Sequence, residues 1–175
     1  MYKKVLIVVD MLKDFCQEGG ALYFPQSEGV KDYIKKRIDA YHEAGEPVIF
    51  LCDAHNKNDK EFALFPPHAI KDTEGAELIE GLVPREDTDI VIEKTRYSGF
   101  FNTPLEFYLE TIAPQLVEVV GVCTSICVMD TVGGLANRDY TMVVDVPGVA
   151  DFDDEAHEAA LKRMENLYKA ELAYD

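Results

Sequence analysis

Basic residues are scarce in this sequence, and no apolar run approaches the length of a membrane-spanning helix. The chain has 17 Lys and Arg residues against 33 Asp and Glu residues, which gives a formal net charge of −16. This excess of negative charge argues against nucleic acid and against an anionic membrane as partners. The apolar part of residues 1–10 is short and ends at Asp10, which does not suit a signal peptide. We therefore expect a cytoplasmic protein that binds neither nucleic acid nor membranes.

Cysteines are also few. The chain has only Cys16, Cys52, Cys123 and Cys127, which is below the density of a small disulfide-stabilised protein, so we expect reduced thiols. The C-x3-C spacing of Cys123 and Cys127 differs from that of zinc ribbons and thioredoxin-like redox proteins. A redox or zinc role for this pair is therefore the least favoured alternative.

The pattern of apolar residues predicts alternating strands and helices. Continuous apolar runs predict buried strands at residues 4–9, 47–52, 89–93, 117–121 and 140–145. Apolar residues at three- and four-residue steps predict helices at residues 27–44, 103–113, 125–137 and 153–168, and one short helix within 76–82. Thr103 and Glu106 have the spacing of a capping box at the start of the second helix. The segment 11–26 is predicted to be a loop that folds over the edge of the sheet.

Strands that alternate with helices indicate the α/β class, with a mostly parallel sheet, helices on both faces and right-handed crossovers. A chain of 175 residues can bury one full core and is too short for two. We therefore expect a single domain over residues 1–175.

Chemically useful side chains follow several of the predicted strands directly. Asp10, Asp53 with His55, Lys94 and Cys127 each come at the carboxyl end of a strand. In open α/β sheets, ligands bind in the crevice outside these ends. The sequence thus predicts a functional site at this edge.

Cys127 is predicted to lie where a buried strand turns into a helix. The free N–H groups and the positive dipole end of a helix favour a thiolate and can hold a developing oxyanion. A carboxylate beside a lysine, such as Asp10 with Lys94, can accept the thiol proton. The alternative for Cys127 is a small buried core residue. His42 and His157 fall within predicted helices and are expected at the surface.

Five motifs in order along the chain resemble those of the isochorismatase-like cysteine hydrolases, and within them the nicotinamidases. They are Asp10, Asp53-x-His55, Phe65-Pro-Pro-His68, Lys94 with Tyr97-Ser-Gly-Phe100, and Gly121-Val-Cys-Thr-Ser-Ile-Cys127. The resemblance implies a three-layer, Rossmann-like fold with a six-stranded parallel sheet. It also implies that Asp10, Lys94 and Cys127 are the catalytic residues of amide hydrolysis.

The resemblance further implies a cis peptide bond between Val122 and Cys123. In the family this arrangement directs the backbone N–H groups of the residues matching Cys123 and Cys127 toward the substrate oxygen. On this interpretation Cys123 contributes its backbone to an oxyanion hole, and its thiol is incidental.

A divalent metal site is predicted beside the catalytic residues. Asp53 and His55 leave the same side of a strand, and His68 can return from the following loop as a third ligand. Glu61 lies near the position where nicotinamidases often place another histidine, so it is a candidate fourth ligand. Oxygen and imidazole ligands suit zinc, iron and manganese, and this chemistry does not choose among them. We expect a divalent metal, with zinc as the first candidate. Asp53 and His55 could instead hydrogen-bond loop backbone, and several family members carry no metal.

Phe15, Phe65 and Tyr97 match the aromatic residues that hold the substrate in nicotinamidases, although Phe65 stands where a Trp is usual and could serve core packing instead. The leading hypothesis is hydrolysis of nicotinamide to nicotinate and ammonia through a Cys127 thioester. The alternatives are a hydrolase of another small amide, carbamoyl or ureido compound, and a non-catalytic binding member. By resemblance, the protein is expected to be a homo-oligomer.

Overall fold

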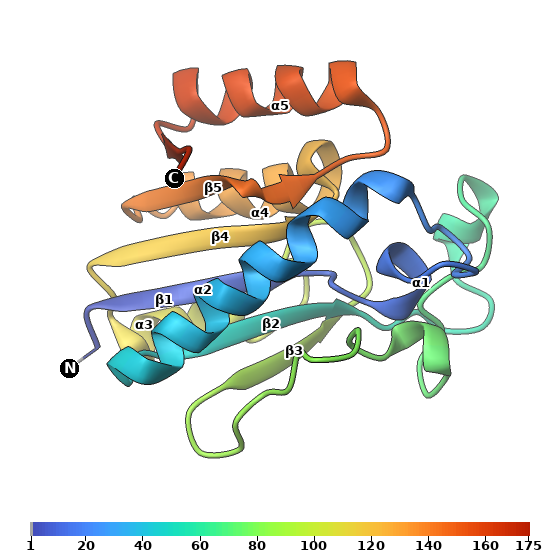
Figure 1. Cartoon of the computed structure of the whole chain (residues 1–175), viewed down its shortest axis with the longest axis horizontal. Helices are drawn as coiled ribbons and strands as arrows, with labels where there is room; N and C mark the ends of the chain where they lie inside the picture. The colour runs from blue at the N-terminus through green and yellow to red at the C-terminus, as the bar shows by residue number, and fades with distance from the viewer. Residues whose placement is uncertain (1) are drawn as a thin grey trace.

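A six-stranded parallel sheet forms the centre of the computed structural model, which describes residues 2–175 (Figure 1). The strand order is β3-β2-β1-β4-β5-β6, and every neighbouring pair is parallel. The six-stranded α/β prediction is therefore confirmed. The strands are β1 (Lys4–Val9), β2 (Val48–Asp53), β3 (Ile90–Lys94), β4 (Leu116–Val122), β5 (Met142–Ala150) and β6 (Glu171–Ala173).

The central strands are apolar because helices cover both of their faces. Every residue of β2 is buried, and so is every residue of β1 after Lys4. Val9 lies opposite Leu51 of β2 and opposite Gly121 of β4. This register brings the carboxyl ends of three strands to one place, as the sequence predicts.

The helices form two layers around the sheet (Figure 1). On one face, α2 (Lys31–Ala44) packs with the short α1 (Lys13–Cys16). On the other face lie α3 (Leu105–Ile112), α4 (Met129–Ala136) and α5 (Asp154–Asn166). Four shorter helical turns are η1 (Pro25–Val30), η2 (Lys60–Ala63), η3 (Glu74–Ala76) and η4 (Thr124–Val128).

The short helix predicted within 76–82 is wrong. The 3₁₀ turn η3 ends at Ala76, the first residue of this segment, and Leu78 makes an isolated antiparallel bridge with Leu12. The N–H group of Ile79 donates to the carbonyl of Met11 at 3.1 Å. Long-range backbone pairing thus replaces the local hydrogen bonds that the apolar spacing predicts.

The predicted capping box does not form. Glu106 instead reaches Arg138, with 3.0 Å between Oε2 and Nη2. The hydroxyl of Thr103 accepts a bond from the N–H of Leu105 at 3.3 Å, so only half of the motif is present.

Two further boundaries differ from prediction. The 3₁₀ turn η1 occupies the start of the helix predicted at 27–44, and α2 itself begins at Lys31. Strand β5 continues five residues beyond the predicted end, because a register shift between Val119 and Gly121 lets it pass Pro147 and resume pairing. This extension carries the following segment to the functional edge.

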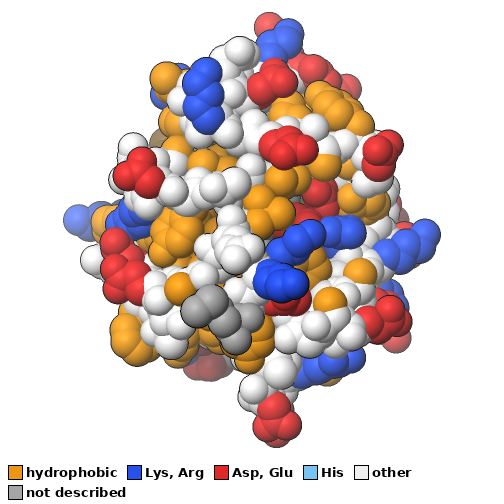
Figure 2. Space-filling model, turned by 90° about the vertical axis from the view of Figure 1, so that its left-hand side faces the viewer, with side chains coloured by type: hydrophobic (Ala, Val, Ile, Leu, Met, Phe, Trp, Pro, Cys, Tyr) orange, Lys and Arg blue, Asp and Glu red, His pale blue; other side chains and the backbone are white. Residues whose placement is uncertain are grey.

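The end of the molecule that carries the amino ends of the strands has a mixed surface (Figure 2). Acidic and basic side chains are interspersed there among hydrophobic ones, so the acidic excess forms no continuous patch on this face. Among residues 2–175, none of the helices combines the length and the apolar character that a membrane crossing requires.

Candidate active site

Lys94 is the centre of the cluster at the carboxyl edge of the sheet. Its ammonium nitrogen lies 2.7 Å from Oδ2 of Asp10 and 2.6 Å from Oδ1 of Asp53. The same nitrogen lies 3.5 Å from the sulfur of Cys127. All four residues are buried, so water does not screen these contacts. The three residues predicted to be catalytic are thus in mutual reach.

Asp10 is fixed by the backbone around it. Its N–H group donates to the carbonyl of Leu51 at 2.8 Å, and its Oδ1 accepts from the N–H of Asp53 at 2.8 Å. Burial, followed by the charge of Asp53, raises the pKa of the Asp10 carboxyl to about 6, although Lys94 opposes the shift. Burial also raises the pKa of the Cys127 thiol, and Lys94 again opposes it. At neutral pH the arrangement therefore favours a neutral thiol beside a carboxylate that can accept its proton.

Cys127 lies in η4, a single π-helical turn that follows β4. The N–H group of Val128 donates to the carbonyl of Cys123 at 3.2 Å, which spans five residues. Such turns hold one residue more than an α-helical turn and are frequent at functional sites. The peptide bond between Val122 and Cys123 is cis, as the family resemblance implies.

Asp53, His55 and His68 form a compact set of possible metal ligands. One ligand atom of each lies within 4.8 Å of those of the other two, and all three residues are buried. Oε1 of Glu61 lies 3.9 Å from Nε2 of His55 and 3.8 Å from Nε2 of His68. Glu61 therefore lies beside the two histidines of this three-residue set.

This donor set fits a divalent cation. Among the described residues, Nε2 of His55 is buried without a hydrogen-bond partner, an arrangement that costs free energy unless a ligand satisfies it. The other ring nitrogen of His68 lies 2.7 Å from the carbonyl oxygen of Pro66, which orients the ring with Nε2 toward the set. The mixture of carboxylate oxygens and imidazole nitrogens is one that zinc, iron and manganese accept.

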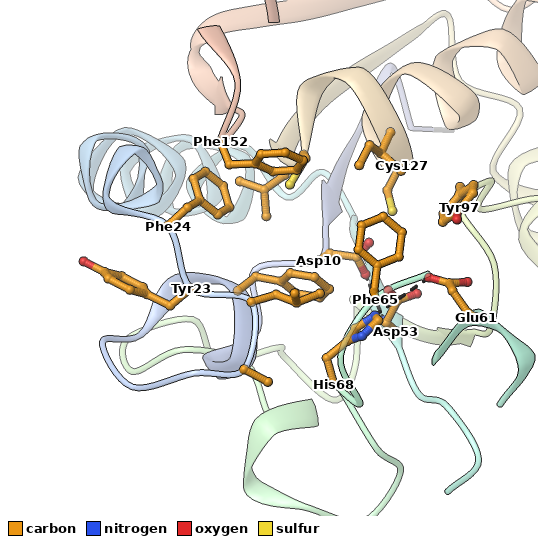
Figure 3. Close-up of a pocket in the computed structure, with 16 residues that line it drawn as sticks. Asp10, Tyr23, Phe24, Asp53, Glu61, Phe65, His68, Tyr97, Cys127 and Phe152 are labelled. Carbon is orange, nitrogen blue, oxygen red and sulfur yellow. Dashed lines mark hydrogen bonds and ion pairs between the residues drawn. The ribbon is translucent and has the colours of Figure 1, made fainter. Parts of the chain in front are cut away.

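A pocket of about 320 Å³ opens above these groups (Figure 3). Figure 3 shows Cys127 on one side of it, Tyr97 and Glu61 together at one end, and Phe24 and Phe152 at the other. Lys94 and His55 are buried and do not line it. The other predicted site residues do line it, namely Asp10, Phe15, Asp53, Glu61, Phe65, His68, Tyr97, Cys123 and Cys127.

Several pocket residues were not predicted from the sequence. The segment 21–24 lines the pocket as part of the loop expected to fold over this edge, and its apolar run within a Gly- and Pro-bearing loop was the available signal. Phe152 follows the unpredicted extension of β5, and its ring packs edge-on against Phe24 with 6.3 Å between centroids. Ile126, beside the thiol, also lines the pocket.

The expectation that His42 and His157 are surface residues is wrong for His42, whereas His157 is partly exposed. Nε2 of His42 lies 2.7 Å from Oδ2 of Asp89, and only 5% of the His42 side chain is exposed. Nδ1 of His157, which is half-buried, lies 2.9 Å from the hydroxyl of Thr124. Helix periodicity identifies neither partner, because both lie far away in the sequence.

Comparison with known proteins places this arrangement in a family. The model of the isochorismatase domain matches residues 4–173. The chain is 34% identical over 181 residues to an uncharacterized isochorismatase family protein, PncA, of Bacillus subtilis, covering 98% of this chain and 99% of the relative. It is 30% identical over 174 residues to a probable inactive nicotinamidase of Arabidopsis thaliana, covering 93% of this chain and 88% of the relative.

Solved structures of the same kind superimpose closely. The crystal structure of the nicotinamidase/pyrazinamidase PncA of Bacillus subtilis has a TM-score of 0.93 at 36% identity, with 98% of this chain and 100% of that chain covered. The pyrazinamidase of Pyrococcus horikoshii in complex with zinc has a TM-score of 0.92 at 27% identity, with 99% of each chain covered.

Proposed function

Because the chain belongs to the isochorismatase family of hydrolases, we propose that it is a cysteine amidohydrolase that converts nicotinamide to nicotinate and ammonia. The observation that carries the proposal is the contact of Cys127 with Lys94 beside a pocket that Asp10 and three of the possible metal ligands, Asp53, Glu61 and His68, also line. The likeness to the Bacillus subtilis nicotinamidase supports the choice of substrate.

The chemistry begins with a proton transfer. Asp10 accepts the proton of Cys127, and the thiolate attacks the carboxamide carbon. The backbone N–H groups of Cys123 and Cys127 hold the oxyanion that forms. Lys94 keeps Asp10 oriented and stabilises the thiolate with its positive charge, which the buried contacts make strong.

The leaving group then departs as ammonia, with Asp10 returning the proton to the nitrogen. The acyl group remains on Cys127 as a thioester. A water molecule attacks this thioester, and Asp10 accepts its proton. The carbon–sulfur bond then breaks, Asp10 passes the proton to the Cys127 thiolate, and the acid leaves and ionises to nicotinate. Each step uses one carboxylate in alternate protonation states, which suits a carboxyl whose pKa is raised to about 6.

Asp53, His55, His68 and Glu61 would hold a divalent metal ion, with zinc the first candidate. When bound, such an ion supplies a Lewis acid that can accept the pyridine nitrogen of the substrate.

Aromatic side chains supply the binding surface for the ring. Phe15 and Phe65 both pack edge-on against His68, with 5.4 and 6.2 Å between ring centroids. Tyr97 lines the pocket with them. A flat ring held by such side chains loses its contact with water, which favours binding.

The test is ammonia release from purified protein given nicotinamide, with the metal content measured on the same sample. Cys127→Ala should abolish turnover and keep the fold. Cys52→Ala, which removes a buried thiol outside the pocket, should remain active. Retained turnover in Cys127→Ala would contradict the mechanism.

Other outcomes point to the alternatives. Metal without turnover would redirect the search to other small amides, carbamoyl or ureido compounds. Neither metal nor turnover would favour a metal-free hydrolase and remove the assignment of Asp53, His55 and His68. Failure of nicotinaldehyde, an electrophilic probe, to label Cys127 would favour a non-catalytic binding protein.

A further inference from the structure

The turn that carries Cys127 is tied to the first turn of α5. Nδ1 of His157 lies 2.9 Å from the hydroxyl oxygen of Thr124, which is fully buried. One of these two groups donates a hydrogen bond and the other accepts it. The bond joins residues 33 positions apart in the sequence. It therefore connects the nucleophile turn to a helix that contributes nothing else to the proposed chemistry.

A second tie acts on the next residue of the same turn. Oδ2 of Asp151 accepts a hydrogen bond from the N–H group of Ser125 at 2.7 Å. Asp151 is only 2% exposed, and its other oxygen accepts from the N–H of Asp153 at 3.3 Å. The segment 151–157 thus holds two consecutive residues of the turn.

These two hydrogen bonds hold the part of the chain between the two N–H groups of the proposed oxyanion hole. Thr124 and Ser125 lie between Cys123 and Cys127, whose N–H groups form the proposed oxyanion hole. The turn also contains one residue more than an α-helical turn, and its hydrogen bond from Val128 to Cys123 spans five residues. Its backbone is therefore less regular than that of an α-helix. Because catalysis depends on sub-ångström placement of the nucleophile, external ties of this kind affect rate directly.

We propose that His157 is a positioning residue, which holds Cys127 in its attack geometry through the hydrogen bond to Thr124. It does not touch the pocket. This proposal rests on the proposed function, because one of its tests measures the rate of nicotinamide hydrolysis. A second test therefore measures the reactivity of Cys127 without any substrate.

The kinetic experiment uses a double-mutant cycle. His157→Leu and Thr124→Val each remove the hydrogen bond, and each should lower kcat about tenfold with KM little changed, since a lost bond of ordinary strength has about this effect. The double variant should be no slower than either single one. His157→Asn, which keeps a polar atom near the place of Nδ1, and Thr124→Ser should retain most of the activity.

The independent readout is the rate at which iodoacetamide alkylates Cys127, followed by peptide mass spectrometry. Alkylation should slow in His157→Leu and in Thr124→Val. It should stay at the wild-type rate in His157→Asn and in Glu158→Ala, the control at the exposed neighbouring position of α5.

The outcomes separate the two proposals. Unchanged alkylation and kcat in the two apolar variants, additive losses in the double variant, or losses that vanish when rates are normalised to the folded fraction would each overturn the role of His157. Absence of nicotinamide hydrolysis in the wild type, with the alkylation pattern as expected, would overturn the substrate and leave the positioning role standing.

Discussion

The ammonium nitrogen of Lys94 lies 2.7 Å from Oδ2 of Asp10, and both side chains are shielded from water, with exposed fractions of 0% and 1%. The same cation also contacts Asp53 and Cys127. One positive charge therefore serves two carboxylates and a thiol. Because burial makes unpaired charge costly, each member of this cluster depends on Lys94.

Replacing Lys94 with Met should abolish turnover and destabilise the fold by about 3–5 kcal/mol, since it leaves Asp10 and Asp53 buried without their cation. Urea unfolding of the metal-free protein measures the change. Adding Asp53→Asn to this variant should recover part of the stability and none of the activity. If Lys94→Met and the wild type have the same free energy of unfolding, the positive charge of Lys94 is not needed to stabilise the buried carboxylates of Asp10 and Asp53.

Removing the metal should lower thermal stability as well as activity. A ligand that binds only the folded state stabilises it by about 2.7 kcal/mol when its free concentration is 100 times its Kd. Chelation should therefore lower the Tm, and added zinc, iron or manganese should restore it. His68→Ala should lose the bound metal, whereas His42→Asn, which disrupts the pair with Asp89, should keep it. Equal metal content in both variants would contradict the assigned ligands.

A second buried acidic cluster lies under α2, away from the pocket. Arg37 donates to both carboxylate oxygens of Glu118 at 2.6 Å, and its Nε lies 3.3 Å from Oδ2 of Asp145. The hydroxyl of Tyr41 donates to Oε2 of Glu118 at 3.0 Å. Tyr33, also on α2, faces Asp145 and lowers the pKa of its carboxyl slightly through a side-chain hydrogen bond. Burial, followed by the hydrogen bond and charge of Glu118, raises the pKa of the Asp145 carboxyl to about 7.

This shift predicts a pH dependence of stability. Between the ordinary carboxyl pKa of 3.8 and about 7, the folded state holds a proton on Asp145 that the unfolded state has released. The free energy of unfolding should therefore decrease as pH rises through this window. Asp145→Asn should flatten the dependence, and Asp39→Asn, an exposed residue of α2, should not. Urea titrations at several pH values give the free energy of unfolding as a function of pH. If this dependence is the same in Asp145→Asn and in the wild type, Asp145 is not its source.

Gly121 is required where β4 passes β1. Its φ of +120° is rarely adopted by other residues, and an added Cβ would lie 2.1 Å from the carbonyl oxygen of Val9. Gly121→Ala should therefore destabilise the protein by about 4 kcal/mol or more. Gly29→Ala, where an added Cβ meets nothing within 4 Å, should change stability by less than about 0.5 kcal/mol. Thermal or urea unfolding compares the two, and similar losses would contradict the steric argument.

The role of Phe65 can be separated from core packing by kinetics. Phe65→Ala should raise the KM for nicotinamide about tenfold with kcat little changed, because a lost aromatic contact weakens binding by about 1–2 kcal/mol. The neighbouring Leu64→Ala removes a side chain that is 78% exposed and should change neither value. A loss of stability in Phe65→Ala without a change in KM would assign the ring to packing.

Local patterns in the sequence were sufficient to predict five of the six strands and the edge at which the candidate site residues meet, whereas β6 was implied only by the family resemblance. Continuous apolar runs identify β1, β2 and β4, and the residue that follows each run is placed at the edge automatically. The residue types at those ends then indicate the chemistry. The motifs resembling the family added the candidate metal ligands and the candidate aromatic residues, which the structure brings together in and beside one pocket.

The errors arose where pairing at long range decides the structure. Ile79 bonds to Met11 in place of continuing a helix, and Glu106 reaches Arg138 in place of its own helix start. Strand β5 passes Pro147, a residue that normally ends a strand, because β5 itself is irregular there: the pairs Val119 with Val144 and Gly121 with Val149 leave Pro147 among unpaired residues of β5. His157 gave no sign of its partner, since nothing in the sequence links it to Thr124.

Strand β1 comes first in the sequence but lies inside the sheet between β2 and β4, so the site at its end is completed only by segments made later. The residues that line the pocket come from segments between Asp10 and Phe152, and His157, which bonds to the turn of Cys127, lies just beyond them. Contacts between distant segments form late in folding, because chain entropy opposes them until the intervening elements have formed. If His157 positions Cys127 as proposed, we expect a ribosome-bound chain that has released Cys127 but not α5 to present an ordinary thiol. We expect its reactivity to arise only after α5 has emerged and packed.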